Sequence, residues 1–369
     1  MSIINLPSVT DLSGFYVIYK GSTNIEKKGT YGISHLMEHL VAKAFDPYQD
    51  ELDRLGLDMN AYTSSNEIVF YLQGLDESLS RWRSKFVEKL ENFDITKKEF
   101  ENERNIVLQE YMDSFNDQQS NHWLNLNRKY FNHHNAIGSK EDLESLTYLD
   151  CLNFFEEQYL NPSSIINVSK NIEFGMDMKF NNTVIDKEYK YLNDNKFILQ
   201  KDNEYNNKVS LIMSSDIIKQ DFNKIKFVNS MLSSGLQSPF YDEIREKRGL
   251  VYFIGMSLGR FNEQGVNSIF TMTTSDNIDK IIEIISTIFN DIDQFLTKKR
   301  FNVVKDSIAN QLKKNEINRY QHINTWVNPD GWSLEEIIDD IDYLQILDVA
   351  QKYYNISNFR ISRDDQEFK

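Results

Sequence analysis

The chain has little cysteine, and this limits where it can work and how it could hold a metal. Cys151 is the single cysteine among 369 residues, so no intrachain disulfide can form. A reducing, soluble compartment such as the cytoplasm is therefore the expected location. The same count excludes a cysteine-rich structural zinc site, and any zinc would have to be held by histidines and carboxylates.

Long apolar runs are also absent. No stretch approaches the roughly 18 apolar residues that a membrane-spanning helix needs, so we expect no membrane partner. The first residues, Met1 to Leu6, lack the basic start and the apolar core of a signal peptide.

Positive charge is in deficit. The 41 Lys and Arg residues are outnumbered by 56 Asp and Glu residues, which gives a formal net charge of −15. This balance argues against a nucleic-acid partner and favours solubility. It fits either an ordinary solvated acidic surface or a surface that steers basic ligands.

The chain does contain enough apolar material for folded domains, with 40% hydrophobic and 13% aromatic residues. Strand and helix patterns alternate up to about residue 170 and restart after a polar stretch. The second half then shows a strand at 209–213, a helix at 222–232, a strand at 267–273 and a long helix at 277–295. The pattern predicts two copies of one α+β unit, with domains at 1–180 and 208–369 and a polar linker at 181–207.

One short motif points to chemistry. The segment from His35 to His39 reads His-Leu-Met-Glu-His, and Ser34 before it is the expected helix N-cap. On a helix, histidines four residues apart share a face, where two imidazoles can bind one metal ion. The adjacent Glu38 could then take a proton from metal-bound water. The motif predicts metal-assisted hydrolysis, and the alternative is two surface histidines on an amphipathic helix.

A later helix carries two carboxylates on one face. Thr96 is expected to cap this helix, with Glu99 as its capping-box partner. Glu103 and Glu110 lie seven residues apart, with apolar residues between them on the same face. Either a metal ion or a position at the solvated margin of the helix explains such carboxylates.

Four segments together resemble the pitrilysin/insulinase family of zinc metallopeptidases, whose histidine motif is inverted relative to His-Glu-x-x-His. Within this family, the chain is most similar to the small, processing-peptidase-like bacterial members. The segments occur in the family's order and span nearly the whole chain: 32–39 (GISHLMEH), 60–64 (NAYTS), 103–110 (ERNIVLQE) and 245–252 (REKRGLVY).

The resemblance implies both a fold and a reaction. The implied fold has two similar α+β domains, each a mainly antiparallel sheet covered by helices, which together form half of a clamshell. The implied reaction is zinc-dependent endopeptidase hydrolysis of short or unfolded peptides in an enclosed dimer chamber. A homodimer is expected first, and a heterodimer is the second expectation.

The resemblance also implies a role for each matched residue of the first half. His35, His39 and Glu110 match the Zn²⁺ ligands. Glu38 matches the general base that activates the zinc-bound water. Glu103 matches an acidic residue that we expect to orient a ligand without binding the ion itself.

Substrate-binding residues are implied in both halves. Asn60 and Ala61 match the edge strand along which the family binds substrate as an added strand. Arg245 and Tyr252 match a catalytic pair that binds substrate and stabilises the oxyanion. We expect this pair to act in trans from the partner chain, and action in cis is the alternative.

Two other functions stay open. The chain could be a non-catalytic family member that binds peptides or supports an active partner subunit, or a plain interaction protein with an accidental motif. The intact set of His35, Glu38, His39 and Glu110 favours catalysis, because a degenerate subunit usually lacks one of them. The spacing of 71 residues from His39 to Glu110 is slightly short for the family, which we expect to affect substrate selectivity more than catalysis.

Overall fold

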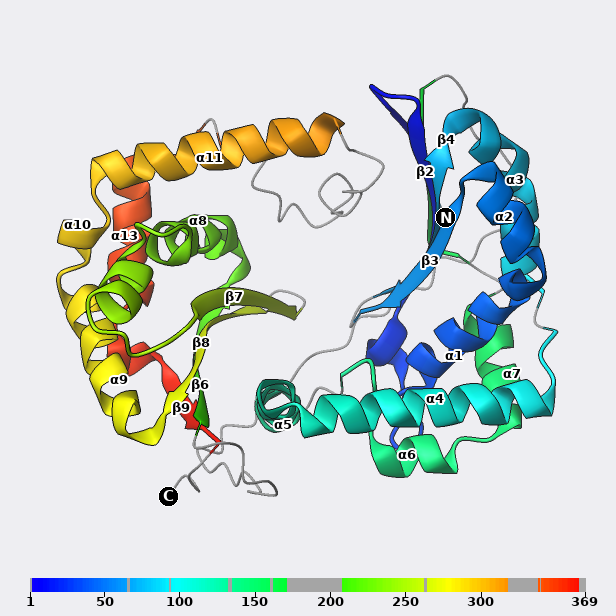
Figure 1. Cartoon of the computed structure of the whole chain (residues 1–369), viewed down its shortest axis with the longest axis horizontal. Coiled ribbons are helices and arrows are strands. Elements are labelled where there is room, and N and C mark those ends of the chain that lie inside the picture. The colour runs from blue at the N-terminus through cyan, green and yellow to red at the C-terminus, as the bar shows by residue number, and fades with distance from the viewer. Residues whose placement is uncertain are drawn as a thin grey trace. The chain divides into compact units, whose positions relative to one another are not determined.

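The computed structural model describes residues 2–64, 67–92, 94–131, 135–159, 162–170, 208–261, 264–317, 338 and 340–364. These residues form two compact units (Figure 1). The first unit takes in the described residues of 2–120, 126–170 and 315–317, and the second takes in those of 121–125, 208–314 and 338–364. The linker expected at 181–207 lies outside the described residues.

A five-stranded sheet of order β1-β5-β2-β4-β3 forms the base of the first unit. Its strands are β1 (Ser2–Pro7), β2 (Leu12–Lys20), β3 (Asp58–Thr63), β4 (Glu67–Leu75) and β5 (Ser164–Ser169). Neighbouring strands are antiparallel except β1 and β5, which are parallel. Strand β1 was not predicted, because its partner comes from the far end of the unit and local pattern does not show that pairing.

Helices cover one face of this sheet (Figure 1). Alternation along β2 sends Phe15, Val17 and Tyr19 to that face, where they are buried together with Leu36 and Leu40 of α1. Burial of each such side chain is worth roughly 2 kcal/mol, so α1 is held firmly against the sheet. The helices are α1 (Ile33–Ala42), α2 (Gln49–Leu55), α3 (Asp76–Leu90), α4 (Lys97–Asn116), α6 (Lys140–Ser145) and α7 (Tyr148–Gln158), with short turns η1 (Ser22–Ile25) and η2 (Lys43–Tyr48).

The second unit has a four-stranded antiparallel sheet of order β7-β8-β6-β9. Its strands are β6 (Lys208–Ile218), β7 (Ile254–Phe261), β8 (Gln264–Thr274) and β9 (Arg360–Arg363). Its helices are α8 (Phe222–Ser233), α9 (Ser275–Asn290), α10 (Ile292–Phe295), α11 (Lys298–Ile317) and α13 (Tyr343–Tyr353), with short helices η3 (Lys219–Asp221), η4 (Tyr241–Glu246) and η5 (Ile356–Asn358).

The prediction of one long helix at 277–295 was wrong. The segment forms two helices because Asp291 leaves the helical conformation, with ψ at 32°. The apolar spacing continues through the break, with Ile288 and Ile292 both buried, so periodicity alone does not reveal it.

The two sheets share one strand order. The order β3-β4-β2-β5 of the first unit is matched by β7-β8-β6-β9 of the second, and all pairs in both sets are antiparallel. In each set, the third strand in this order is followed along the chain by a helix: α1 comes after β2, and α8 comes after β6. The predicted fold of two similar α+β domains with helix-covered, mainly antiparallel sheets is confirmed.

Helix α5 (Gln118–Phe131) contributes a buried histidine to the second unit. His122 is 1% exposed, and its two ring nitrogens lie 2.8 Å from Ser210 Oγ and 2.7 Å from Ser362 Oγ. One nitrogen therefore donates a hydrogen bond and the other accepts one, and the ring links β6 to β9. Burial lowers the pKa of His122 to about 3, so the ring is neutral at neutral pH.

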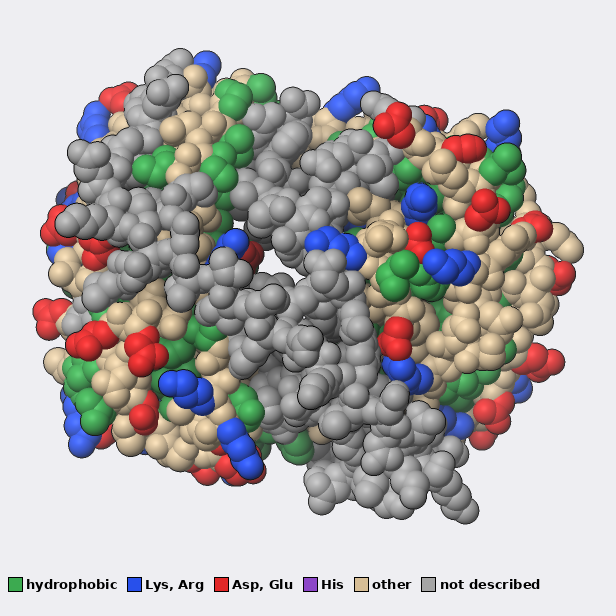
Figure 2. All heavy atoms as spheres, turned by 180° about the vertical axis from the view of Figure 1, so that it is seen from behind, with side chains coloured by type: hydrophobic (Ala, Val, Ile, Leu, Met, Phe, Trp, Pro, Cys, Tyr) green, Lys and Arg blue, Asp and Glu red, His purple; other side chains and the backbone are tan. Residues whose placement is uncertain are grey.

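The surface mixes charges of both signs. On the face shown in Figure 2, the described acidic and basic side chains are interspersed over both units, and neither sign gathers into a broad patch. Throughout the described residues, no helix combines the length and the apolar character that a membrane crossing requires.

Candidate metal centre

The start of α1 is set by an upstream glutamate. Gly32 is the N-cap, with φ at 96°, and the carboxylate of the buried Glu26 accepts hydrogen bonds from the backbone N–H groups of Gly32 (3.0 Å) and Ser34 (2.9 Å). The prediction of Ser34 as the N-cap was therefore wrong, because Glu26 folds back to supply the acceptor. Ser34 instead lies buried in the first turn.

Close backbone packing also fixes this end of α1. Gly138 has φ at 79°, and a Cβ at this position would lie 2.5 Å from Cα of Gly32. No side chain fits at that distance, so glycine lets the loop before α6 press against the start of the motif helix.

Helix α4 carries the acidic residues Glu103 and Glu110. The Thr96 hydroxyl accepts a hydrogen bond from the backbone N–H of Glu99, and the Glu99 carboxylate accepts one from the backbone N–H of Thr96, so the predicted capping box is confirmed. Two turns separate Glu103, which is buried, from Glu110, whose side chain is 42% exposed. Val107 between them is fully buried, which places this face of α4 against the rest of the unit.

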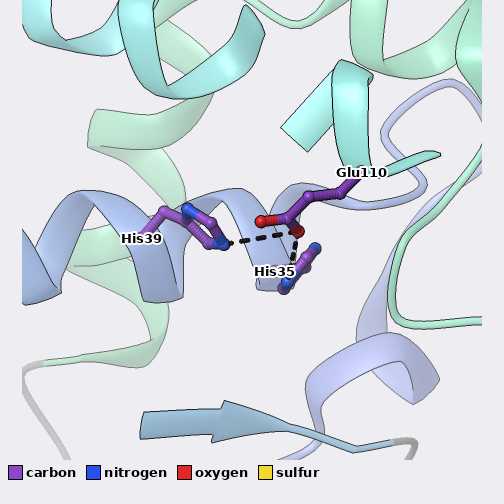
Figure 3. Close-up of side chains that lie close together, drawn as sticks. All are labelled: His35, His39 and Glu110. Carbon is purple, nitrogen blue, oxygen red and sulfur yellow. Dashed lines mark ion pairs between the residues drawn. The ribbon is translucent and has the colours of Figure 1, made fainter. Parts of the chain in front are cut away.

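The structure brings three of the predicted residues to one point (Figure 3). Nε2 of His35 and Nε2 of His39 each lie 3.7 Å from Oε2 of Glu110. One ligand atom from each residue falls within 4.8 Å of the others. Two imidazole nitrogens and one carboxylate oxygen are the donors that a catalytic zinc ion takes from a protein, so this set fits Zn²⁺ and leaves a fourth position open.

The protonation state of His35 suits a metal ligand. Burial, followed by the nearby His39, lowers the pKa of His35 to about 4. The ring is therefore neutral at neutral pH, and a neutral imidazole keeps a lone pair for a metal.

Glu38 faces the same region from α1. Its Oε2 accepts a hydrogen bond of 2.5 Å from the hydroxyl of Thr63 on β3. Burial raises the pKa of the Glu38 carboxyl, Glu110 adds to this rise, and the Thr63 hydrogen bond and His39 oppose it. A carboxylate with a raised pKa is better matched to proton transfer near neutral pH.

Glu103 contacts a histidine of the motif from behind. Its Oε2 lies 3.3 Å from Nδ1 of His39. A carboxylate at Nδ1 favours the tautomer that carries its proton there, which leaves Nε2 free to bind a metal.

Asn60 and Ala61 lie on β3, the edge strand of the first sheet. The Asn60 side-chain oxygen accepts a hydrogen bond of 2.8 Å from the backbone N–H of Ala61. In the described residues, β3 pairs with β4 on one side only. Its other side therefore presents backbone groups that can pair with an added strand.

Arg245 and Tyr252 lie together in the second unit. The Arg245 guanidinium carbon is 5.1 Å from the centroid of the Tyr252 ring and 4.4 Å from that of Tyr241. Arg245 lies in the π-helical turn η4, a conformation that is frequent at functional sites. Tyr252 is 84% exposed, so its hydroxyl is open to a ligand.

Sequence reasoning gave no role to Thr63, although it lies in one of the recognised segments. The alternation along β3 could have pointed to it, because it puts Thr63 on the same face of the strand as Ala61. Ala61 packs against the core beneath α1, so Thr63 also faces this helix.

Comparison with known families now decides what the chain is. A family model described as Insulinase (Peptidase family M16) matches residues 14–139, and one described as Peptidase M16 inactive domain matches residues 162–308. The chain belongs to peptidase family M16. The family recognised from the sequence is thus confirmed.

Individual M16 relatives agree with this assignment. A Rickettsia felis protein named as an uncharacterized zinc protease is 22% identical over 388 aligned residues, which cover 95% of this chain and 92% of that protein. The probable mitochondrial-processing peptidase subunit beta of Schizosaccharomyces pombe is 28% identical over 151 residues, which cover 38% of this chain and 33% of that subunit.

The fold of this chain is also seen in a solved structure. The crystal structure of a protease from Helicobacter pylori superimposes with a TM-score of 0.80 at 16% identity and covers 98% of this chain and 96% of that chain. At this identity, the likeness shows the shared fold.

Proposed function

We propose that this M16 chain is a zinc-dependent endopeptidase that hydrolyses short or unfolded peptides. The observation that carries the proposal is the meeting of one ligand atom each from His35, His39 and Glu110 within 4.8 Å, with Glu38 on the same helix as the two histidines. The zinc chemistry would belong to residues 1–180, and the Arg245 and Tyr252 pair to residues 208–369.

The two histidine ligands would be prepared for the ion before it binds. His35 is kept neutral by burial, and Glu103 holds the Nδ1 proton of His39, so that both Nε2 atoms keep their lone pairs. When bound, zinc supplies a Lewis acid that polarises a peptide carbonyl and lowers the pKa of water.

Glu38 is the general base in this proposal. It accepts a proton from the attacking water at its carboxylate and later passes that proton to the nitrogen of the leaving amine. The hydroxyl of Thr63 occupies Oε2, which leaves Oε1 for the proton transfer.

Substrate would bind through backbone pairing and through charge. The open side of β3 at Asn60 and Ala61 would take an extended peptide as an added strand, which selects unfolded segments. Arg245 and Tyr252 would bind substrate and donate hydrogen bonds to the developing oxyanion.

We propose that two chains pair, as a homodimer first and otherwise with a different M16 chain. The Schizosaccharomyces pombe relative is named as a subunit, which is consistent with paired chains in this family. Arg245 and Tyr252 of one chain would then serve the zinc site of the other.

A mixing experiment separates action in trans from action in cis. Glu38→Gln chains and Arg245→Ala chains are each expected to be nearly inactive alone. If the pair acts in trans, a mixed dimer contains one intact site, and activity returns on mixing. If no activity returns although mixed dimers form, the pair acts in cis.

The proposed reaction is tested with Glu38→Gln. Hydrolysis of an unfolded fluorogenic peptide should fall by roughly 100- to 10,000-fold, while zinc content by atomic absorption stays at one ion per chain. Loss of zinc as well would mean that Glu38 is a ligand and that its assigned role is wrong. A wild-type chain that cleaves no peptide with zinc, and behaves the same with a chelator, would support a non-catalytic, peptide-binding subunit instead.

A further inference from the structure

The Glu103 carboxylate contacts both a histidine and a lysine near the C-terminal end of α1. Its Oε2 lies 3.3 Å from Nδ1 of His39, and its Oε1 lies 3.2 Å from Nζ of Lys43. Lys43 follows His39 by four residues and is the C-cap of α1, so both side chains reach toward α4 from one face. The two oxygens of one carboxylate thus join the motif histidine to a cation.

Because Glu103 is buried, its carboxylate depends on the ion pair with Lys43. The Glu103 side chain is 6% exposed, whereas that of Lys43 is 33% exposed. An ionised carboxylate removed from water is costly unless a positive group compensates it. Across the described residues, the ion pairs of Glu103 are those with His39 and Lys43, and His39 must be neutral to bind a metal.

The position of the Glu103 carboxylate decides which tautomer His39 adopts. A carboxylate beside Nδ1 accepts a hydrogen bond, so the proton of His39 stays on Nδ1 and the Nε2 lone pair faces Glu110. A Glu103 side chain turned away from Nδ1 would leave the ring proton free to occupy Nε2 and block the metal position. The other ligand has no such partner, because Nδ1 of His35 is buried without a hydrogen-bond partner among the described residues.

We propose that Lys43 is a positioning residue for the metal centre, which acts through Glu103 to hold His39 in its metal-binding tautomer. The inference rests on the zinc site of the proposed function and adds to it a residue that contacts no ligand atom of that site.

Asp46 provides a matched comparison within the same cluster. Its Oδ2 lies 2.9 Å from Nζ of Lys43, and its side chain is 63% exposed. Asp46 therefore pairs with the lysine on the solvent side, where an ion pair is worth little, and the inference predicts that its loss leaves zinc binding nearly unchanged.

The test measures zinc affinity by competition with a chromophoric chelator. Lys43→Met removes the charge at similar length and should weaken zinc binding by about tenfold, the lower end of the effect of losing a group that orients a ligand. Lys43→Arg keeps the charge and should stay within about threefold of wild type. Asp46→Asn should also keep its zinc affinity within about threefold of wild type. The same is expected of Lys85→Met, which removes a lysine of equal exposure (33%) that pairs with Glu51 elsewhere on the unit.

A double variant tests the path through Glu103. Glu103→Gln should weaken zinc binding at least as much as Lys43→Met, and Lys43→Met combined with Glu103→Gln should bind zinc no more weakly than Glu103→Gln alone. Wild-type affinity in Lys43→Met, or additive losses in the double variant, would overturn the inference. Thermal unfolding of the metal-free proteins checks the fold of each variant. If Lys43→Met is unstable, Lys43→Arg serves for the comparison. A tenfold loss of zinc affinity in Lys43→Arg would also overturn the inference.

These measurements do not depend on peptidase activity. A wild-type chain that binds zinc but cleaves no peptide would refute the proposed function and leave Lys43 to be judged by the affinities alone. A wild-type chain that binds no zinc would refute both.

Discussion

Thr63 on β3 donates its hydroxyl hydrogen bond to Oε2 of Glu38 on α1, so the edge strand of the sheet holds the proposed general base. The two residues are 25 positions apart in the sequence, and the packing of α1 on β3 brings them together. The strand that would bind substrate and the base that would act on it are therefore fixed to each other.

Thr63→Val should lower kcat for peptide hydrolysis by about tenfold or more, because the Glu38 carboxylate loses the donor that orients it. Valine keeps the shape of threonine, so the strand should stay intact. Thr63→Ser restores a hydroxyl and should recover most of the rate. Steady-state kinetics on a fluorogenic peptide measure this, and equal kcat values for Thr63→Val and wild type would show that the contact has no catalytic role.

Glu110→Gln should weaken zinc binding by about 100-fold or more, since an amide is a much poorer zinc ligand than a carboxylate. Glu101 lies on the same helix and is exposed, so Glu101→Gln is the control and should bind zinc as wild type does. Isothermal titration of the metal-free proteins gives both affinities. Unchanged binding in Glu110→Gln would remove Glu110 from the ligand set.

His122 should make the second unit sensitive to acid. Its folded pKa of about 3 lies below the ordinary value of about 6.5, so the unfolded chain binds the proton first. As the pH falls from about 6.5 toward 3, the free energy of unfolding should drop by roughly 1 kcal/mol per pH unit from this group. Above that window the group adds no pH dependence.

The variant His122→Gln isolates this effect, because glutamine can still donate and accept a hydrogen bond but does not titrate. Urea unfolding at pH 7 and at pH 5 should show a smaller loss of stability in the variant than in wild type. Equal losses in the two proteins would mean that His122 titrates normally and is not buried as described.

Gly138→Ala should destabilise the first unit by several kcal/mol, because the new Cβ meets the backbone at Gly32 and the φ angle of 79° disfavours alanine. Gly56→Ala is the matched control. Gly56 also has a positive φ, of 62°, but a Cβ there meets nothing within 4 Å, so about 1 kcal/mol is expected. Differential scanning fluorimetry should show a much larger fall in Tm for Gly138→Ala. Similar falls in both would show that conformation alone, and not close packing, restrains Gly138.

The features that the sequence predicted well are those encoded by neighbouring residues. The capping box of Thr96 and Glu99 is complete within four positions, and helix α8 begins at the predicted Phe222. The histidine motif is equally local, because one helical turn brings His35 and His39 to the same face. The prediction that Glu110 would join them needed a family resemblance, since nothing in its surroundings on α4 specifies a partner on α1.

The features that were missed depend on contacts between distant segments. The N-cap of α1 is Gly32, and the carboxylate that accepts hydrogen bonds from the first backbone N–H groups comes from Glu26 in the preceding loop, whereas Ser34 had the right residue type at the right place in a local pattern. The same holds for β1, which pairs with β5, and for the contact between Lys43 and Glu103. Residue type and spacing cannot show these pairings, because they form only when the sheet assembles.

The repeated strand order separates the scaffold from the chemistry. Four strands follow the same order in both units, and the first sheet adds β1 beside β5. In the second unit the place of α1 is taken by α8, whose sequence FNKIKFVNSMLS contains no histidine. The same arrangement of strands and helix therefore exists with and without the histidine pair, so a metal site depends on the side chains placed on the scaffold and not on the scaffold itself.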